Sequence, residues 1–217
     1  KKMVDEFISR GFNYFDTAFV YDGSEEAVKK ILVDRYPREN YYLATKLASW
    51  VNCASKEDAM AQFTTSLERT GAGYFDFYLL HNLGGNRTEI AEEYGIWDFV
   101  AQKKKEGLIK HIGFSFHSTA DELDTILTKH PEAEFVQLQI NYADWDSDSI
   151  QSRKCYETTR KHGKPVIVME PVKGGSLTNL PTEAQEILNG MSSSPATVAL
   201  RFAEGLDGIM MVLSGMS

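Results

Sequence analysis

Seven short apolar segments recur along this chain of 217 residues, and a segment with helical spacing lies between each and the next. The segments are almost continuously apolar, which is typical of parallel strands covered by helices. No two neighbouring segments are joined by the two-residue turn of a β-hairpin. We therefore expect a parallel sheet of strand–helix units, with strands over residues 14–18, 41–46, 75–81, 111–116, 135–141, 165–170 and 209–213.

Helix start signals occur between these segments. Ser55 precedes an amphipathic stretch, and Ser194-Pro195 combines a cap with a proline in the first turn. Ser24 and Ser118 are expected to cap two further helices. Residues 82–94 are polar and contain two adjacent glycines, so we expect a long loop there.

Seven units running in one direction indicate an α/β fold of the (β/α)8 TIM-barrel type with one unit absent. The chain opens inside a helix and stops just after the seventh segment, so we expect a truncated barrel without its first strand and final helices. A doubly wound open sheet is the competing fold. It normally carries a glycine-rich turn after its first strand, and residues 19–24 contain none. No linker divides residues 1–217, so we expect a single domain.

Composition argues against several classes of function. The net charge is -8, and Lys103–Lys105 is the longest basic run, so neither nucleic acid nor an anionic membrane is an expected partner. No apolar run reaches the ~18–20 residues that span a bilayer. Cys53 and Cys155 lie far apart and lack metal-ligand spacing. Two such thiols and no signal peptide favour a cytoplasmic protein without a disulfide framework.

Polar residues stand where the predicted strands end. In a parallel barrel these ends share one face, so residues distant in sequence converge there. Each alone is more often structural than functional, but the combination is harder to dismiss. The residues are Asp16, Lys46, His81, Ser115, the group Gln137–Asn141 and Glu170, with Tyr21 in the first loop.

These residue types support one specific chemistry. A phenol is a weak acid near neutral pH, but a lysine ammonium beside it stabilises the phenolate, and a carboxylate holds the lysine in place. A neutral imidazole can orient a substrate carbonyl. Together they form a general acid aimed at a carbonyl oxygen. No metal-ligand cluster or activated serine competes with this interpretation, and the reductant has to be a cofactor.

Five segments, in this order and at fitting spacing, resemble the aldo-keto reductases across essentially the whole chain. They are Phe15-Asp16-Thr17-Ala18 with Tyr21, Ala44-Thr45-Lys46, Tyr78-Leu79-Leu80-His81, Ile112-Gly113-Phe114-Ser115 and Val136-Gln137.

The resemblance implies an oxidoreductase that reduces an aldehyde or ketone with NADPH, or with NADH as the alternative. It implies a catalytic tetrad of Asp16, Tyr21, Lys46 and His81, in which Tyr21 donates the proton. Ser115 and Gln137 would hydrogen-bond the nicotinamide carboxamide. The loop that contains Glu170, Val172 and Gly174 would lie along the pyrophosphate.

The chain departs from the family pattern at several positions. Phe116 stands where the family often has Asn, and Met169 stands where many members stack an aromatic ring on the nicotinamide. The basic residue expected to contact the NADP 2′-phosphate is not seen in residues 214–217. Residues 81–99 and 113–117 look like the prokaryotic branch with a C-terminal iron–sulfur extension. Two isolated cysteines cannot ligate such a cluster, so this chain does not support one.

The substrate site is predicted less sharply. Phe19, Val20 and Trp50 are positioned to line an apolar pocket for a small carbonyl compound, although simple packing explains each equally well. An aldolase-like Schiff base on Lys46 is a second hypothesis. Asp16 argues against it, because that chemistry requires a desolvated lysine without a carboxylate partner. A non-catalytic nucleotide-binding barrel subunit, or a truncated remnant, is a third. Substrate, direction and oligomeric state stay open.

Overall fold

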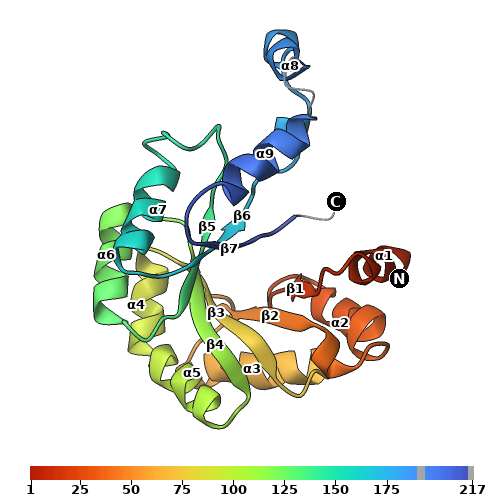
Figure 1. Ribbon diagram of the computed structural model, residues 1–217. Helices are drawn as coiled ribbons and strands as arrows, with labels where there is room; N and C mark the ends of the chain where they lie inside the picture. Colours follow the sequence, from red (N-terminus) through yellow and green to blue (C-terminus); the bar gives the residue numbers. More distant parts are fainter. Residues whose placement is uncertain (190–193, 215–217) are drawn as a thin grey trace. The chain divides into compact units, whose positions relative to one another are not determined.

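The chain alternates strands and helices throughout, which confirms the α/β class (Figure 1). The computed structural model describes residues 1–189 and 194–214. They form two compact units, residues 1–115 and 116–217. Strands follow chain order in each, β1-β2-β3-β4 in the first and β5-β6-β7 in the second. Whether the two units act as the single domain expected from the sequence stays a prediction.

The first unit begins with a helix and contains the strands that carry most of the polar strand-end residues. Its elements are α1 (Lys2–Ser9), β1 (Tyr14–Asp16), α2 (Ser24–Val28), the π-helix η1 (Lys29–Val33), the 3₁₀-helix η2 (Arg38–Asn40), β2 (Tyr42–Leu47), α3 (Lys56–Thr70), β3 (Phe75–Leu83), α4 (Asn86–Glu93), α5 (Ile96–Lys105) and β4 (Ile109–Phe116), which ends at the boundary.

Strands β1, β2 and β3 pair in parallel, with Asp16 opposite Ala44 and Lys46 opposite Leu79. Helix α3 packs against β2 and lies between α2 and α5 (Figure 1). Its start is the predicted one, because the Ser55 side chain accepts from the Asp58 N–H and Asp58 reaches back in a capping box. The inward face of α3 buries Phe63, whose ring lies edge-on to that of Tyr78.

Three local predictions in the first half of the chain and just beyond it are wrong. Gly23, not Ser24, caps α2, and the Ser24 hydroxyl instead hydrogen-bonds Thr17 Oγ1 at 2.7 Å. The expected loop over residues 82–94 contains α4, which has almost no apolar stripe to reveal it. Thr119 replaces Ser118 as the cap of the next helix, since its side chain accepts from the Glu122 N–H.

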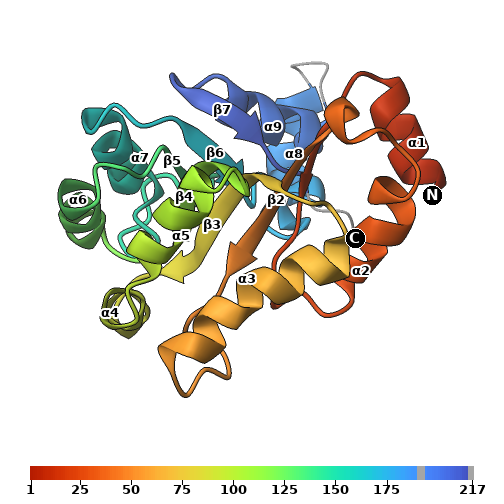
Figure 2. The same cartoon turned by 90° about the horizontal axis from the view of Figure 1, so that it is seen from below.

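The second unit is built in the same way. Its elements are α6 (Ala120–Lys129), β5 (Phe135–Gln139), α7 (Ser152–Lys161), β6 (Val166–Met169), the 3₁₀-helix η3 (Ser176–Thr178), α8 (Thr182–Asn189), α9 (Pro195–Glu204) and β7 (Ile209–Val212). β5 pairs with β6 and β6 with β7, all in parallel. Helices α6 and α7 lie side by side (Figure 2). Ser194 caps α9 as predicted, accepting from the Thr197 N–H.

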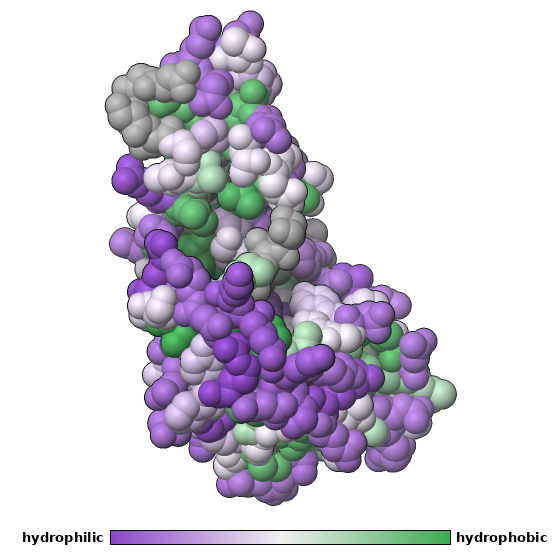
Figure 3. All heavy atoms as spheres, turned by 90° about the vertical axis from the view of Figure 1, so that its right-hand side faces the viewer, coloured by the Kyte–Doolittle hydropathy of each residue, from purple (hydrophilic) through white to green (hydrophobic). Residues whose placement is uncertain are grey.

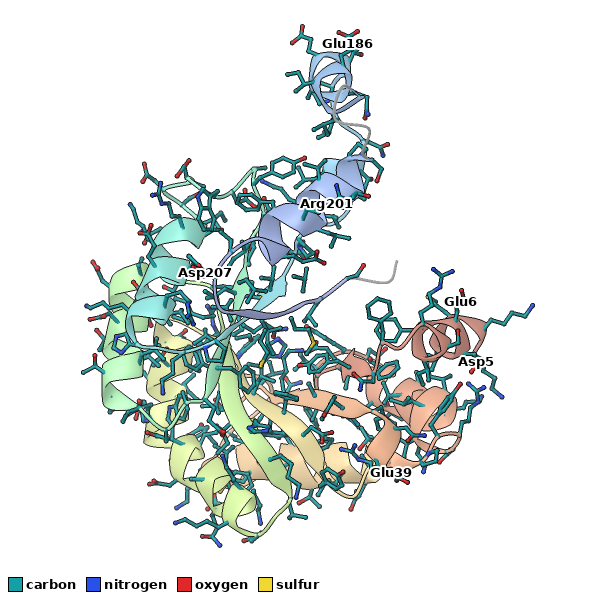
Figure 4. All side chains as sticks on the ribbon, viewed as in Figure 1. Asp5, Glu6, Glu39, Glu186, Arg201 and Asp207 are labelled. Atoms are coloured by element: carbon teal, nitrogen blue, oxygen red, sulfur yellow. The ribbon has the colours of Figure 1, made fainter. Side chains whose placement is uncertain are left out.

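Several charged side chains lie on the outside of the two units. Glu6 on α1, Glu186 on α8 and Arg201 on α9 are exposed (Figure 4). On the face drawn in Figure 3, hydrophilic residues predominate and hydrophobic ones form small patches. Within the described ranges, no helix is both long and apolar enough to cross a bilayer.

Candidate active site

Lys46 is the buried centre of the polar cluster in the first unit. Its side chain lies at the end of β2 and is almost fully buried. The ammonium donates to Asp16 Oδ1 and, at 2.8 Å, to the carbonyl of Thr17. The register explains the pair: Asp16 is opposite Ala44, and Lys46 lies two residues further along the same face of β2. The sequence-predicted partners Asp16 and Lys46 are therefore in direct contact.

Asp16 has acceptor capacity left after this ion pair. Its second oxygen, Oδ2, is buried and accepts no hydrogen bond from the described residues. The carboxylate is therefore held by the ammonium of Lys46 rather than by a network of its own.

Tyr21 lies in the loop after β1, and its ring contacts the side chains of Lys46 and His81. The Lys46 ammonium is 5.1 Å from the centre of the phenol ring. The ring meets that of His81 edge to face, with 5.7 Å between centroids. Two backbone hydrogen bonds, from Tyr21 N to Ala18 O and from Ser24 N to Tyr21 O, fix the turn. Tyr21 is 45% exposed, so a small molecule can reach the ring while the lysine beneath stays buried.

His81 reaches this place from β3. Lys46 is opposite Leu79, and His81 lies two residues further along the same face of β3. Its carbonyl accepts a hydrogen bond of 3.1 Å from Trp50 Nε1. The structure thus brings together all four residues that the sequence predicted as a tetrad, and it places Trp50 beside them.

A buried glutamate behind the site was not predicted from the sequence. Glu25 is fully buried and accepts from Thr45 Oγ1 at 2.7 Å and from Arg69 at 3.4 Å. Thr45 immediately precedes Lys46 in β2. Glu25 had no visible signal, because its partners lie 20 and 44 residues away in sequence.

Phe19 and Val20 line a cavity of about 230 Å³, together with Asn52 and Arg69. Tyr21, His81 and Trp50 are not among the residues that line it. Trp50 instead donates to the His81 carbonyl, while its neighbour Val51 lines the cavity. That Phe19, Val20 and Trp50 contact a substrate stays a prediction.

Ser115, at the end of β4, is buried and already engaged. Its hydroxyl accepts a hydrogen bond of 2.7 Å from the backbone N–H of Asn82, the residue after His81. Asn82 itself adopts the left-handed conformation, with φ at 55°. Ser115 therefore holds the end of β3 whatever else it binds.

In the second unit, Gln137 on β5 carries an unsatisfied buried acceptor. Its side chain is almost fully buried, and Oε1 accepts no hydrogen bond from any described residue. Such an atom costs free energy unless a ligand or water donates to it. Gln137 therefore fits a ligand that carries an N–H group.

The loop after β6 has an unusual backbone. Glu170, Lys173, Gly174 and Gly175 all have positive φ, at 58°, 50°, 59° and 90°. Val172 turns the loop, with its carbonyl accepting from the N–H groups of Gly175 and Leu177. Successive residues of this kind can direct backbone N–H groups toward an anion.

This loop is anchored by Asn141, which belongs to the predicted strand-end group, and by Asp144, which the sequence reasoning missed. The buried carboxylate of Asp144 accepts from the Lys173 ammonium and, at 2.9 Å, from Asn141 Nδ2. Asn141 also donates to the Glu170 carbonyl at 3.2 Å. The short Asn-x-x-Asp spacing could have indicated a turn with a side-chain cap, because the Asp144 N–H returns a hydrogen bond to Asn141 Oδ1.

Among the described residues, no group of three His, Cys, Asp or Glu side chains is arranged to hold a metal ion. Cys53 and Cys155 are both free thiols.

A model of the Aldo/keto reductase family matches residues 1–217. An aldo-keto reductase of Mycolicibacterium smegmatis is 32% identical over 129 residues, 59% of this chain and 43% of that protein. Aldo-keto reductase str7 of Strobilurus tenacellus is 30% identical over 181 residues, 82% of this chain and 51% of that protein. The chain thus spans about half the length of these curated relatives.

The fold also matches a solved structure. An aldo-keto reductase from Klebsiella pneumoniae, in complex with NADPH, superimposes with a TM-score of 0.72 at 21% identity. The match covers 99% of this chain and 73% of that one. The barrel-type α/β fold expected from the sequence is thereby confirmed.

Proposed function

Because the chain belongs to the aldo/keto reductase family, we propose that it catalyses NAD(P)H-dependent reduction of an aldehyde or ketone to an alcohol, with Tyr21 as general acid. The observation that carries this proposal is that the Lys46 ammonium, held by Asp16, lies 5.1 Å from the centre of the Tyr21 ring. No other acid in the cluster is both exposed to a small molecule and backed by a cation.

Each of the four residues has a separate role in the proposed reaction. The Lys46 ammonium stabilises the phenolate that Tyr21 becomes as its proton leaves for the carbonyl oxygen. Asp16 holds Lys46 in place and balances its charge. His81, edge-on to Tyr21, orients the carbonyl by a hydrogen bond. When bound, the nicotinamide cofactor supplies the hydride to the carbonyl carbon.

The residues available for that cofactor fit its chemistry. The unsatisfied Gln137 Oε1 can accept from the carboxamide NH₂ of nicotinamide. Ser115 keeps its own proton to donate, because it only accepts from Asn82. Glu170, Val172 and Gly174 belong to the loop whose positive φ angles suit a pyrophosphate.

NADPH is the proposed cofactor, and NADH the alternative. The chain's likeness to a reductase solved with NADPH supports this choice. The predicted position of 2′-phosphate contacts, residues 214–217, lies mostly outside the described residues. A cytoplasmic location, which agrees with two free thiols, also stays a prediction.

The test is Tyr21→Phe, assayed by NADPH oxidation with a panel of small aldehydes. We expect a loss of roughly 10²–10⁴ in kcat, as for removal of a general acid, with the Kd for NADPH within about twofold. Tyr42→Phe is the matched control, because it removes an exposed phenol from the start of β2, at the other end of that strand from Lys46. Undiminished turnover by Tyr21→Phe would refute the proposed role.

The non-catalytic alternative predicts binding without turnover. Titrating the chain with NADPH while following nicotinamide fluorescence separates the hypotheses. If NADPH binds but no carbonyl compound in the panel oxidises it, the chain is better explained as a nucleotide-binding subunit.

The Schiff-base hypothesis predicts covalent trapping of a carbonyl compound on Lys46 by borohydride. The ion pair with Asp16 disfavours it, because a charged lysine is not a nucleophile.

A further inference from the structure

Arg87 is connected to His81 of the proposed tetrad through contacts with Asn82 and Trp50. It is in the first turn of α4, the helix in the segment expected to be a loop. Its Nε donates to the carbonyl of Asn82 at 2.6 Å, and Asn82 directly follows His81. The guanidinium carbon lies 5.9 Å from the centre of the Trp50 ring. Because Trp50 also donates to the His81 carbonyl, Arg87, Trp50 and His81 form one contiguous cluster.

The charge of Arg87 is not balanced locally. No Asp or Glu among the described residues forms an ion pair with it, although its side chain is half-buried. Arg69, in the same unit, differs because it pairs with both Glu25 and Glu26. A partly desolvated cation without a counter-ion is costly, so it attracts an anion that can reach it.

The geometry leaves the donating end of the side chain available. Asn82 occupies Nε alone, and within the described residues the two terminal nitrogens make no hydrogen bond. They can donate as a pair to a carboxylate, whose planar shape matches the guanidinium fork. Trp50 flanks the fork and limits its movement.

We propose that Arg87 recognises a carboxylate on the substrate, so that the preferred substrates are aldehydes or ketones that carry a carboxylate group. This inference rests on the proposed carbonyl reduction and names its substrate class. One guanidinium matches the single charge of a carboxylate. Trp50 then has a defined role: it spans the distance between the carboxylate at Arg87 and the carbonyl at Tyr21 and His81.

The test compares 4-formylbenzoate with benzaldehyde, which differ only in the carboxylate. Wild type is expected to have the higher kcat/KM for 4-formylbenzoate. Arg87→Gln should lower that value by about tenfold or more, mostly through KM, and leave benzaldehyde within about twofold. Arg87→Lys should retain part of the preference. Arg10→Gln is the control, since it removes the same charge from an exposed position on the edge of α1.

Each outcome decides the matter. Equal losses on both substrates would mean that Arg87 only supports the fold, and no change on either would mean that it does not meet the substrate. Both overturn the inference. If wild type reduces neither compound, the proposed function fails, and calorimetric titration with benzoate and benzyl alcohol still tests Arg87. Binding of benzoate that is lost in Arg87→Gln supports the anion site, whereas equal binding of benzoate by both proteins overturns it.

Discussion

Glu25 accepts a hydrogen bond from Thr45, the residue immediately before Lys46, and neither side chain is accessible to solvent. The buried carboxylate of Glu25, in α2, thus holds Thr45 near the end of β2. The ion pair with Asp16 holds the next residue, Lys46. We expect the proposed tetrad to depend on both contacts, although only the second was visible in the sequence.

Glu25→Ala is expected to destabilise the fold by about 2–3 kcal/mol, because it leaves the buried Thr45 hydroxyl without its acceptor and removes the buried carboxylate partner of Arg69. Urea unfolding followed by circular dichroism measures the change. Glu26→Ala is the matched control: this neighbour also pairs with Arg69 but is mostly exposed, so its loss should cost less than about 1 kcal/mol. Similar costs for both variants would contradict the assignment.

Lys46→Met should separate stability from activity. The variant leaves the largely buried Asp16 without its partner, which is expected to cost about 3 kcal/mol and abolish carbonyl reduction. Adding Asp16→Asn removes the uncompensated charge, so the double variant should recover much of the stability. Its activity should stay lost, because the ammonium under Tyr21 is still missing. Recovered activity in the double variant would contradict the role of Lys46.

Asp144 should make the second unit sensitive to acid. Burial raises the pKa of Asp144, but hydrogen bonds from Lys173 and two amides lower it more, so the net pKa is below its usual value. A depressed carboxyl pKa contributes stability above about pH 4, which is lost as the pH falls through the folded-state value. The stability difference between wild type and Asp144→Asn should therefore shrink below about pH 4. Asp148→Asn, at an exposed position, should show no such change.

Cys155 should be a poor nucleophile in the folded protein. Burial raises the pKa of its thiol to about 11, which leaves little thiolate at pH 8. In the Cys53→Ser variant, iodoacetamide should modify Cys155 at least about a hundredfold more slowly at pH 8 than it modifies an unperturbed thiol. Unfolding in urea should abolish the difference. Mass spectrometry of the alkylated protein provides the measurement.

The fold and the proximity of the four candidate residues could be predicted because both depend on strong local patterns. Apolar strands ending on a polar residue were recognisable at Asp16, Lys46 and His81, and parallel pairing brings strand ends to one edge. Ala44 lies opposite Asp16, and because side chains alternate along a strand, Lys46 lies on the same face of β2 as Ala44. The capping box at Ser55 was equally local, since both of its partners lie within four residues.

What failed depended on contacts distant in sequence or on weak patterns. Ser24 looks like a helix cap, but the hydroxyl of Thr17 competes for it, and a glycine with positive φ takes the position before the helix. Helix α4 lacks an apolar stripe, so nothing in its composition distinguished it from a loop, and Arg87 went unnoticed with it. The ion pair of Asp144 with Lys173 joins the loop after β5 to the loop after β6, and the two residues are 29 positions apart in sequence.

The hydrogen bond from Asn82 to Ser115 has a consequence for interpreting variants. The hydroxyl has one proton to give and receives another, so it can serve the backbone of β3 and a carboxamide at the same time. Ser115→Ala would release the residue that follows His81, and it would also remove the hydroxyl that we propose as a cofactor contact. The loss measured for such a variant is therefore a sum of two effects, and a Kd for NADPH alone cannot apportion it.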